Sequence, residues 1–154
     1  RDRRALADLD SYDVYGGPES GYVQRVYYFD LLSDENQETC VLLKNAEGDK
    51  GSYLCYSTAD LPCFAVWKNT AALEDGYVTG LEPGTDYPNE RSFEREQGRV
   101  VSISPRESYL TSLTIGVCDS AEAVREIEDR VASIRKDVKP LMHDKIVRTF
   151  SPLG

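Results

Sequence analysis

The sequence contains a single histidine, a single methionine and a single tryptophan, and it has no long apolar run. A membrane span needs about 20 apolar residues, and a secretory signal needs an apolar core near the N-terminus. Because neither pattern is present, we expect no membrane partner and a cytoplasmic location. The only methionine is Met142 and the chain begins at Arg1, which suggests a piece of a longer protein.

The chain also lacks the residue patterns of several common catalytic sites. No G-x-S-x-G elbow accompanies its only histidine, His143, which argues against a hydrolase triad. The glycines form neither G-x-G-x-x-G nor a P-loop, and no cluster has metal-ligand spacing. We therefore expect no metal and no cofactor, and we interpret His143 as a surface or packing residue.

Positive charge is scarce. The chain has 18 lysine and arginine residues against 27 aspartate and glutamate residues, which gives a formal net charge of -9. The longest basic run is the opening RDRR. Nucleic acid and other polyanions would be repelled by this balance, so the sequence predicts no nucleic-acid partner.

The four cysteines have no C-x-x-C spacing and stand inside apolar, strand-like runs. Free cysteine is among the most frequently buried residue types, and a chain of this length can build a core without cross-links. We expect Cys40, Cys55, Cys63 and Cys118 to be buried free thiols in a reducing compartment.

The pattern between Gly21 and Val117 predicts an all-β fold. A chain of 154 residues buries about 70% of its unfolded surface and can form a single domain, here residues 1–154. Short runs of β-branched and aromatic residues alternate with turn residues, which is typical of an antiparallel β-sandwich. The expected strands are Tyr22 to Leu32, Glu38 to Asn45, Ser52 to Ser57, Cys63 to Lys68, Tyr77 to Glu82, Arg99 to Ser104 and Ser108 to Cys118.

The period then changes to that of a helix. Asp119 and Glu122 form a D-x-x-E capping pattern, and apolar residues recur every three or four positions from Val124 to Val138. We predict one amphipathic helix over about residues 120–138 that lies on the sheet, followed by a tail over 141–154. A coiled-coil dimer is disfavoured because few heptads are present.

The least generic stretch begins at the single tryptophan. Trp67 is followed by Lys68 and Asn69, an aromatic face beside a cation and an amide, which suits stacking on a sugar and hydrogen-bonding its hydroxyls. The alternative is that Trp67 fills the core of the sandwich while Lys68 extends outward to solvent.

Glu82 ends an apolar strand immediately before the Pro83-Gly84 turn. Strand alternation places it on the same side as Val78 and Gly80. The carboxylate is therefore expected to have small, apolar neighbours. Desolvation there would raise the pKa of Glu82 and suit it as a general base, whereas in the alternative it is a solvated surface glutamate.

Three segments resemble the C-terminal part of the aldose 1-epimerase (galactose mutarotase-like) superfamily, in particular its uncharacterised bacterial branch. They are WKN at 67–69, GYVTGLEPGTDYPNERSFE at 76–94 and GRVVSISPRESY at 98–109. The resemblance extends from roughly Gly21 to Thr114. It implies a β-supersandwich about twice as long as this chain or longer, so the chain is expected to be the C-terminal portion of an incomplete domain.

The resemblance also implies a reaction, the interconversion of the α and β anomers of a free sugar. The family's catalytic glutamate stands in an L-E segment followed by an aromatic-Pro pair, which matches Glu82 with Tyr87-Pro88. By this likeness Glu82 takes the proton of the anomeric hydroxyl while a histidine protonates the ring oxygen. The family's histidine lies far upstream, before Arg1, and His143 does not match it.

Two further positions are assigned from the residues that this chain has. Where relatives have an E-Q pair on an earlier strand, this chain has Gln24-Arg25, and we expect the Gln24 amide to hydrogen-bond a sugar hydroxyl. Arg91 would either hold a carboxylate or phosphate group of a substrate or pair at the surface with Glu90 or Glu94.

The sequence therefore predicts a β-sandwich that binds a monosaccharide or related sugar and carries the base half of an epimerase site. The alternatives are a carbohydrate-binding module without turnover and an inactive truncated fragment. The identity of the sugar and the formation of a homo-oligomer stay open.

Overall fold

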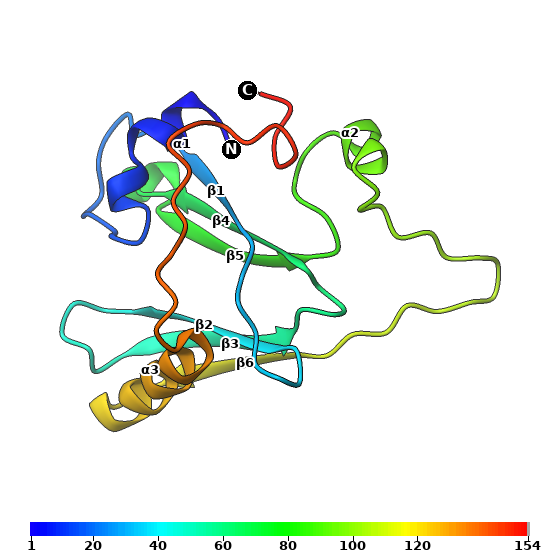
Figure 1. Ribbon diagram of the computed structural model, residues 1–154. Helices are drawn as coiled ribbons and strands as arrows, with labels where there is room; N and C mark the ends of the chain where they lie inside the picture. Colours follow the sequence, from blue (N-terminus) through cyan, green and yellow to red (C-terminus); the bar gives the residue numbers. More distant parts are fainter. Residues whose placement is uncertain (154) are drawn as a thin grey trace. The chain divides into compact units, whose positions relative to one another are not determined.

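The computed structural model describes residues 1–153 and divides into two compact units (Figure 1). Unit 1 comprises Arg1–Asp30, Cys63–Val101 and Leu141–Gly154, and unit 2 comprises Leu31–Pro62 and Ser102–Pro140. Each unit is built on one antiparallel three-stranded sheet.

Unit 1 contains the strands β1 (Arg25–Phe29), β4 (Cys63–Asn69) and β5 (Val78–Gly84) in the order β1-β4-β5. Its helices are short: α1 (Arg3–Ala7), the 3-10 turns η1 (Leu9–Ser11) and η2 (Leu73–Asp75), and α2 (Arg91–Glu96).

The N-terminal segment covers one face of this sheet. The Tyr12 ring lies 6.2 Å from that of Tyr27 and 5.6 Å from that of Phe29, and the Phe29 ring lies 5.8 Å from that of Phe64. Tyr27 and Phe64 are buried. This aromatic cluster makes the covered face the packed side of unit 1.

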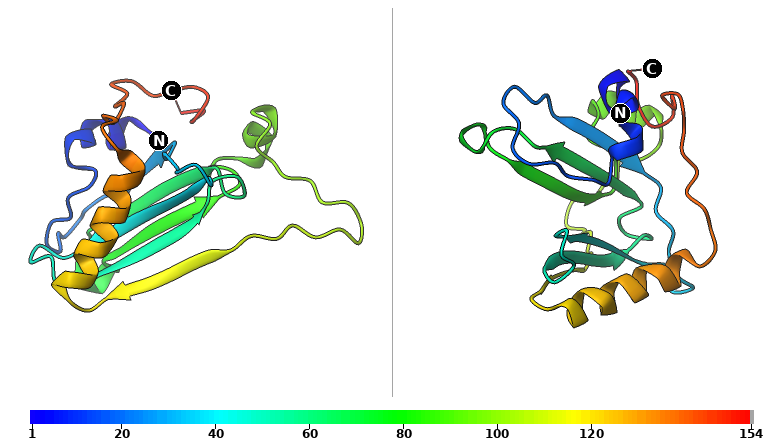
Figure 2. Two further views of the ribbon diagram at one scale, coloured as in Figure 1. Left: turned by 60° about the horizontal axis from the view of Figure 1, so that its bottom comes forward. Right: turned by 90° about the vertical axis from the view of Figure 1, so that its left-hand side faces the viewer.

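Unit 2 contains β2 (Glu38–Lys44), β3 (Gly51–Ser57) and β6 (Leu113–Cys118) in the order β2-β3-β6. Helix α3 (Ala121–Arg135) lies along this sheet and packs against β2 (Figure 2). Val124 on its inner side is fully buried. The predicted C-terminal amphipathic helix is thus present, although Ser120 is its N-cap and it ends at Arg135.

Two sequence expectations about secondary structure are wrong. Residues 99–104, predicted as a strand, lie outside every strand of the described chain, because an extended β-branched run becomes a strand only where a neighbouring strand accepts its hydrogen bonds. The segment after β5, expected to be a loop throughout, contains helix α2.

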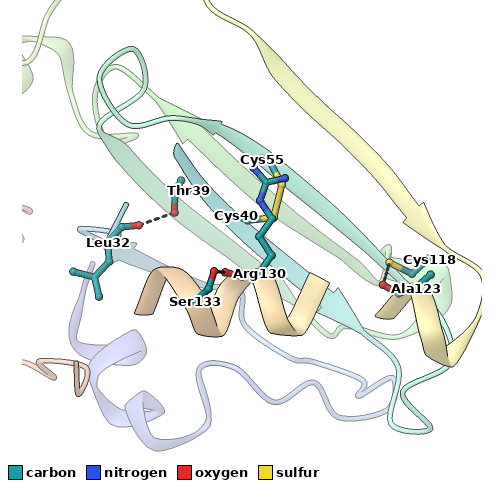
Figure 3. Close-up of a disulfide and its surroundings, with 8 residues drawn as sticks. All are labelled: Leu32, Thr39, Cys40, Cys55, Cys118, Ala123, Arg130 and Ser133. Carbon is teal, nitrogen blue, oxygen red and sulfur yellow. Dashed lines mark hydrogen bonds between the residues drawn. A yellow bond between two sulfur atoms is a disulfide. The ribbon is translucent and has the colours of Figure 1, made fainter. Parts of the chain in front are cut away.

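The expectation of four free thiols is also wrong. Cys40 and Cys55 face each other in the register of β2 and β3, with their Cα atoms 4.2 Å apart, and form a disulfide (Figure 3). Cys63 and Cys118 are free and buried, as expected. Spacing along the chain did not predict the pair, because the strand register brings together residues separated by 15 positions.

No helix within residues 1–153 has the length and apolar character that crossing a membrane requires. The same described residues hold no group of three or more histidine, cysteine or acidic side chains placed to bind a metal ion.

Candidate functional site

Three of the predicted site residues share one face of the unit 1 sheet. Trp67 is paired with Gly80, and Ala65 is paired with Glu82. Directly opposed residues of antiparallel strands project to the same side, so Trp67 and Glu82 share a face, and Asn69 follows Trp67 on it by alternation. We call this the site face. Its residues are Val26 and Tyr28 on β1, Ala65, Trp67 and Asn69 on β4, and Val78, Gly80 and Glu82 on β5.

Gln24 joins the site face through a side-chain contact. The Trp67 indole Nε1–H donates to the Gln24 Oε1 over 2.7 Å. This bond uses the amide oxygen of Gln24 and not the donors on its amide nitrogen. Trp67 is half-buried, so part of its ring surface is accessible.

A shallow pocket of about 350 Å³ lies beside these residues. Gln24 and Asn69 line it together with Tyr22 and Asp75. The Asn69 Nδ2 donates to the Gly76 carbonyl oxygen over 2.9 Å, which fixes the orientation of this amide. Two amides, a carboxylate and an aromatic ring are groups that hydrogen-bond and pack against a polyol.

Glu82 carries the only perturbed carboxylate on the site face among residues 1–153. Burial raises the pKa of Glu82 above its ordinary value, and no compensating charge or hydrogen bond opposes that shift. The neighbours across and along the strands are small, Ala65 and Gly80. A partly desolvated carboxylate without a protein donor keeps its lone pairs available to accept a proton.

Lys68 lies on the opposite face, away from the other predicted site residues. Its Nζ donates to the carbonyl oxygens of Ser11 at 2.7 Å and Val14 at 2.5 Å, and it lies 5.2 Å from the centre of the Tyr15 ring. Burial lowers the pKa of Lys68, and the side chain is only 5% exposed. Of the neighbours Trp67 and Lys68, the lysine is therefore the buried residue and the tryptophan is only half-buried. This is the reverse of the alternative in which Trp67 fills the core and Lys68 extends to solvent.

Arg91 and His143 lie at the surface. Arg91 opens helix α2 and is exposed. The surface pair between Arg91 and Glu94 does not form, because Glu94 is buried and binds Arg99. His143 is exposed, with its ring 6.4 Å from the Phe150 ring in an edge-on contact.

The sequence did not reveal a buried polar network that anchors the segment after Glu82. The Glu94 carboxylate, 1% exposed, accepts from Arg99 Nε at 2.5 Å, Arg99 Nη2 at 2.8 Å, Asn89 Nδ2 at 2.7 Å and the Tyr87 backbone N–H at 3.2 Å. Burial by itself would raise the pKa of Glu94, but these hydrogen bonds outweigh it and lower the pKa. Only the presence of an acid and a base five residues apart signals the pair in sequence.

This network continues to the site face. The Tyr28 hydroxyl donates to the Asn89 Oδ1 over 3.0 Å, and the Tyr28 ring stacks on the Tyr87 ring at 4.7 Å. The Tyr87 hydroxyl donates to the Phe29 carbonyl oxygen over 2.9 Å. Burial raises the pKa of Tyr28 to about 12, so its hydroxyl remains a donor at neutral pH. The segment that follows Glu82 is thereby tied to β1.

A solved structure has the same fold over most of the chain. It is described as the crystal structure of a putative aldose 1-epimerase from Klebsiella pneumoniae subsp. pneumoniae MGH 78578, and it matches 88% of this chain at 36% sequence identity with a TM-score of 0.84. The match covers 35% of that protein, so the chain spans about a third of its length. The predicted likeness to the aldose 1-epimerase superfamily and the predicted all-β sandwich class with one C-terminal helix are confirmed.

A comparison with curated proteins finds no match. A family model described as "Domain of unknown function (DUF4432)" matches residues 1–117, which is more than half of the chain. The chain is therefore a member of the DUF4432 family.

Proposed function

We propose that the chain carries the base half of a sugar epimerase site that interconverts anomers in the protein of which it forms part. The observation that carries this proposal is the Glu82 carboxylate, partly buried and free of a compensating charge, on the same face as Trp67 and Asn69. The likeness to a protein described as a putative aldose 1-epimerase supports the same assignment.

In this proposal Glu82 accepts the proton of the anomeric hydroxyl. An acid protonates the ring oxygen, the ring opens and C1 rotates. The ring then closes on the other face while Glu82 returns its proton to the anomeric oxygen and the acid takes back its proton from the hydroxyl that becomes the ring oxygen. A raised pKa makes the Glu82 carboxylate a better base. The superfamily likeness assigns the acid to a histidine, and nothing in this chain is assigned that role.

The other residues of the site face would hold the sugar. The accessible part of the Trp67 ring would stack on the apolar face of the sugar ring. The amides of Gln24 and Asn69 would hydrogen-bond its hydroxyls from the neighbouring pocket. Arg91, exposed at the start of α2, stays a prediction as a contact for an anionic substituent. Lys68 is assigned to the packing of the opposite face.

The test is the rate of anomer exchange of D-galactose and D-glucose, measured by polarimetry and by NMR exchange. It compares the longer protein of which the chain forms part with its Glu82→Gln variant. We expect this variant to lose about 10²- to 10⁴-fold of the rate acceleration, because a neutral amide cannot take the proton. Glu74→Gln is the matched control, since Glu74 is an exposed glutamate of the same unit, and should leave the rate unchanged. An unchanged rate in Glu82→Gln would refute the proposal.

A second candidate is a carbohydrate-binding module without turnover. It is favoured by the hydrogen-bonded Trp67–Gln24 pair beside a polar pocket. Quenching of Trp67 fluorescence by sugar without any acceleration of anomer exchange would select this function. Exchange that depends on Glu82 would select the epimerase.

A further inference from the structure

Gly80 stands on the site face two residues before Glu82, and the Glu82 side chain bends back over it. A Cβ atom placed on Gly80 would meet the Glu82 Oε1 in direct overlap and would lie 3.1 Å from its Cδ and 3.2 Å from its Cγ. The carboxylate of Glu82 thus occupies the space that any side chain at position 80 would fill.

The strand register shows where this space lies. Gly80 is paired with Trp67, whereas Glu82 is paired with Ala65. The Cβ atoms of directly opposed residues are about 4.5–5.5 Å apart, so a group lying over Gly80 lies next to the tryptophan position. Because Gly80 has no side chain, the Glu82 carboxylate can extend along β5 away from its own paired residue, Ala65, and towards Trp67.

Backbone conformation does not explain a glycine at this position. Gly80 is not one of the glycines with a positive φ, and a glycine inside a strand costs about 0.5–1 kcal/mol relative to alanine. The three heavy atoms nearest to an added Cβ all belong to the movable side chain of Glu82. Gly84 differs, because its Cβ would meet a backbone atom, the Asp86 carbonyl oxygen, at 2.9 Å. Alanine at position 80 is therefore compatible with the fold but not with the present place of the carboxylate.

We propose that Gly80 is a positioning residue, which reserves the space that holds the Glu82 carboxylate against the sheet beside Trp67. The catalytic consequence rests on the proposed function of Glu82 as a base, but the placement of the carboxylate does not. In Gly80→Ala the methyl group displaces the carboxylate towards solvent while the strand persists.

The first test follows the Glu82 carboxyl carbon by NMR during a pH titration of the 154-residue chain. Burial raises the pKa of Glu82, so in Gly80→Ala we expect the pKa to fall back towards the ordinary glutamate value. Gly16→Ala is the matched control, because an added Cβ there meets nothing within 4 Å and its φ is not positive. An unchanged Glu82 titration in Gly80→Ala, with the fold retained, would overturn the inference.

The second test is the anomer exchange assay with the same substitutions made in the longer protein of which the chain forms part. Misplacing a catalytic group by about 1 Å can cost about 10²-fold, and we expect a loss of kcat on this scale in Gly80→Ala with a smaller change in KM. The acidic limb of the pH-rate profile should also move to lower pH. If Glu82→Gln abolishes exchange but Gly80→Ala changes neither rate nor titration, the positioning role is refuted and the proposed function stands. If the titration moves in Gly80→Ala but no protein accelerates exchange, the positioning role stands and the epimerase function fails.

Discussion

Replacing Arg99 by methionine tests the buried network that anchors the segment after Glu82. The change keeps an unbranched, flexible side chain, although a shorter one, and removes both hydrogen bonds to the Glu94 carboxylate, from Nε at 2.5 Å and from Nη2 at 2.8 Å. It also removes the bond from Nη1 to the Thr149 carbonyl oxygen, 2.9 Å long. Glu94 then stays buried with only the donors of Asn89 and Tyr87.

The expected cost is large because a buried charge loses its counter-charge. Breaking a buried ion pair by removing one partner destabilises a protein by about 3–5 kcal/mol. The Glu94 side chain is 1% exposed and the Arg99 side chain is 18% exposed, so solvent screens the pair only slightly. We expect Arg99→Met to lower the free energy of unfolding by about 3 kcal/mol, the lower end of that range, because two donors to Glu94 remain.

The assay is urea unfolding followed by tryptophan fluorescence. Trp67 is the only tryptophan of the chain and belongs to unit 1, which also contains Glu94 and Arg99, so its emission reports on the unit that is perturbed. Arg91→Met is the matched control, since Arg91 is exposed, and it should change stability by less than about 0.5 kcal/mol. The double variant Glu94→Gln/Arg99→Met removes both charges and should be more stable than Arg99→Met alone.

The pH dependence gives a second and independent readout. The hydrogen bonds hold the pKa of Glu94 below its ordinary value of 4.5, so the stability it contributes is complete above that value and is lost as the pH falls through the lowered pKa. In Arg99→Met the carboxyl group is expected to protonate more readily, and the cost of the substitution should therefore shrink below pH 4.5. A cost under about 1 kcal/mol at neutral pH, or one that does not change with pH, would refute the reasoning.

Two further predictions concern the packed face of unit 1 and the sheet of unit 2. Lys68→Met should remove the buried donor of the Ser11 and Val14 carbonyl oxygens and lower the free energy of unfolding by about 1–3 kcal/mol in urea unfolding. Sugar binding should not change, and weaker sugar binding in the folded variant would instead place Lys68 in the site. Reduction of the Cys40–Cys55 disulfide, which spans 15 positions, should lower stability by about 3 kcal/mol in thermal melts with and without dithiothreitol; identical melting curves after verified reduction would contradict this.

Local patterns in the sequence were sufficient for the main elements. The recurrence of apolar residues every three or four positions predicted α3, and Val124, which is buried, is one of these apolar residues. Alternation in β5 placed Gly80 and Glu82 on one side, and the register of the sheet agrees. These features depend on the period of the backbone, which is a property of consecutive residues.

The residues of the candidate site were only partly accessible to such reasoning. Trp67 and Asn69 could be selected as an aromatic ring close to an amide, and Glu82 as a carboxylate at the end of an apolar strand. The structure brings these three residues to one face. The network of Glu94 and Arg99 was not accessible, because its members lie on the short helix α2 and on irregular segments beside it, which are too short to show a period.

What the sequence determined by itself is the place of β1 to β6 and of α3 along the chain, and which residues of a strand alternate to the same side. Only the tertiary structure decided which side is covered. Lys68 and Trp67 are adjacent and point to opposite faces, and the N-terminal segment buries the lysine on one face while the tryptophan stays half-exposed on the other. The pairing of Cys40 with Cys55 was decided in the same way, by strand register. Alternation gives each residue a side, but burial depends on contacts between residues far apart in the chain, and a local pattern does not encode these.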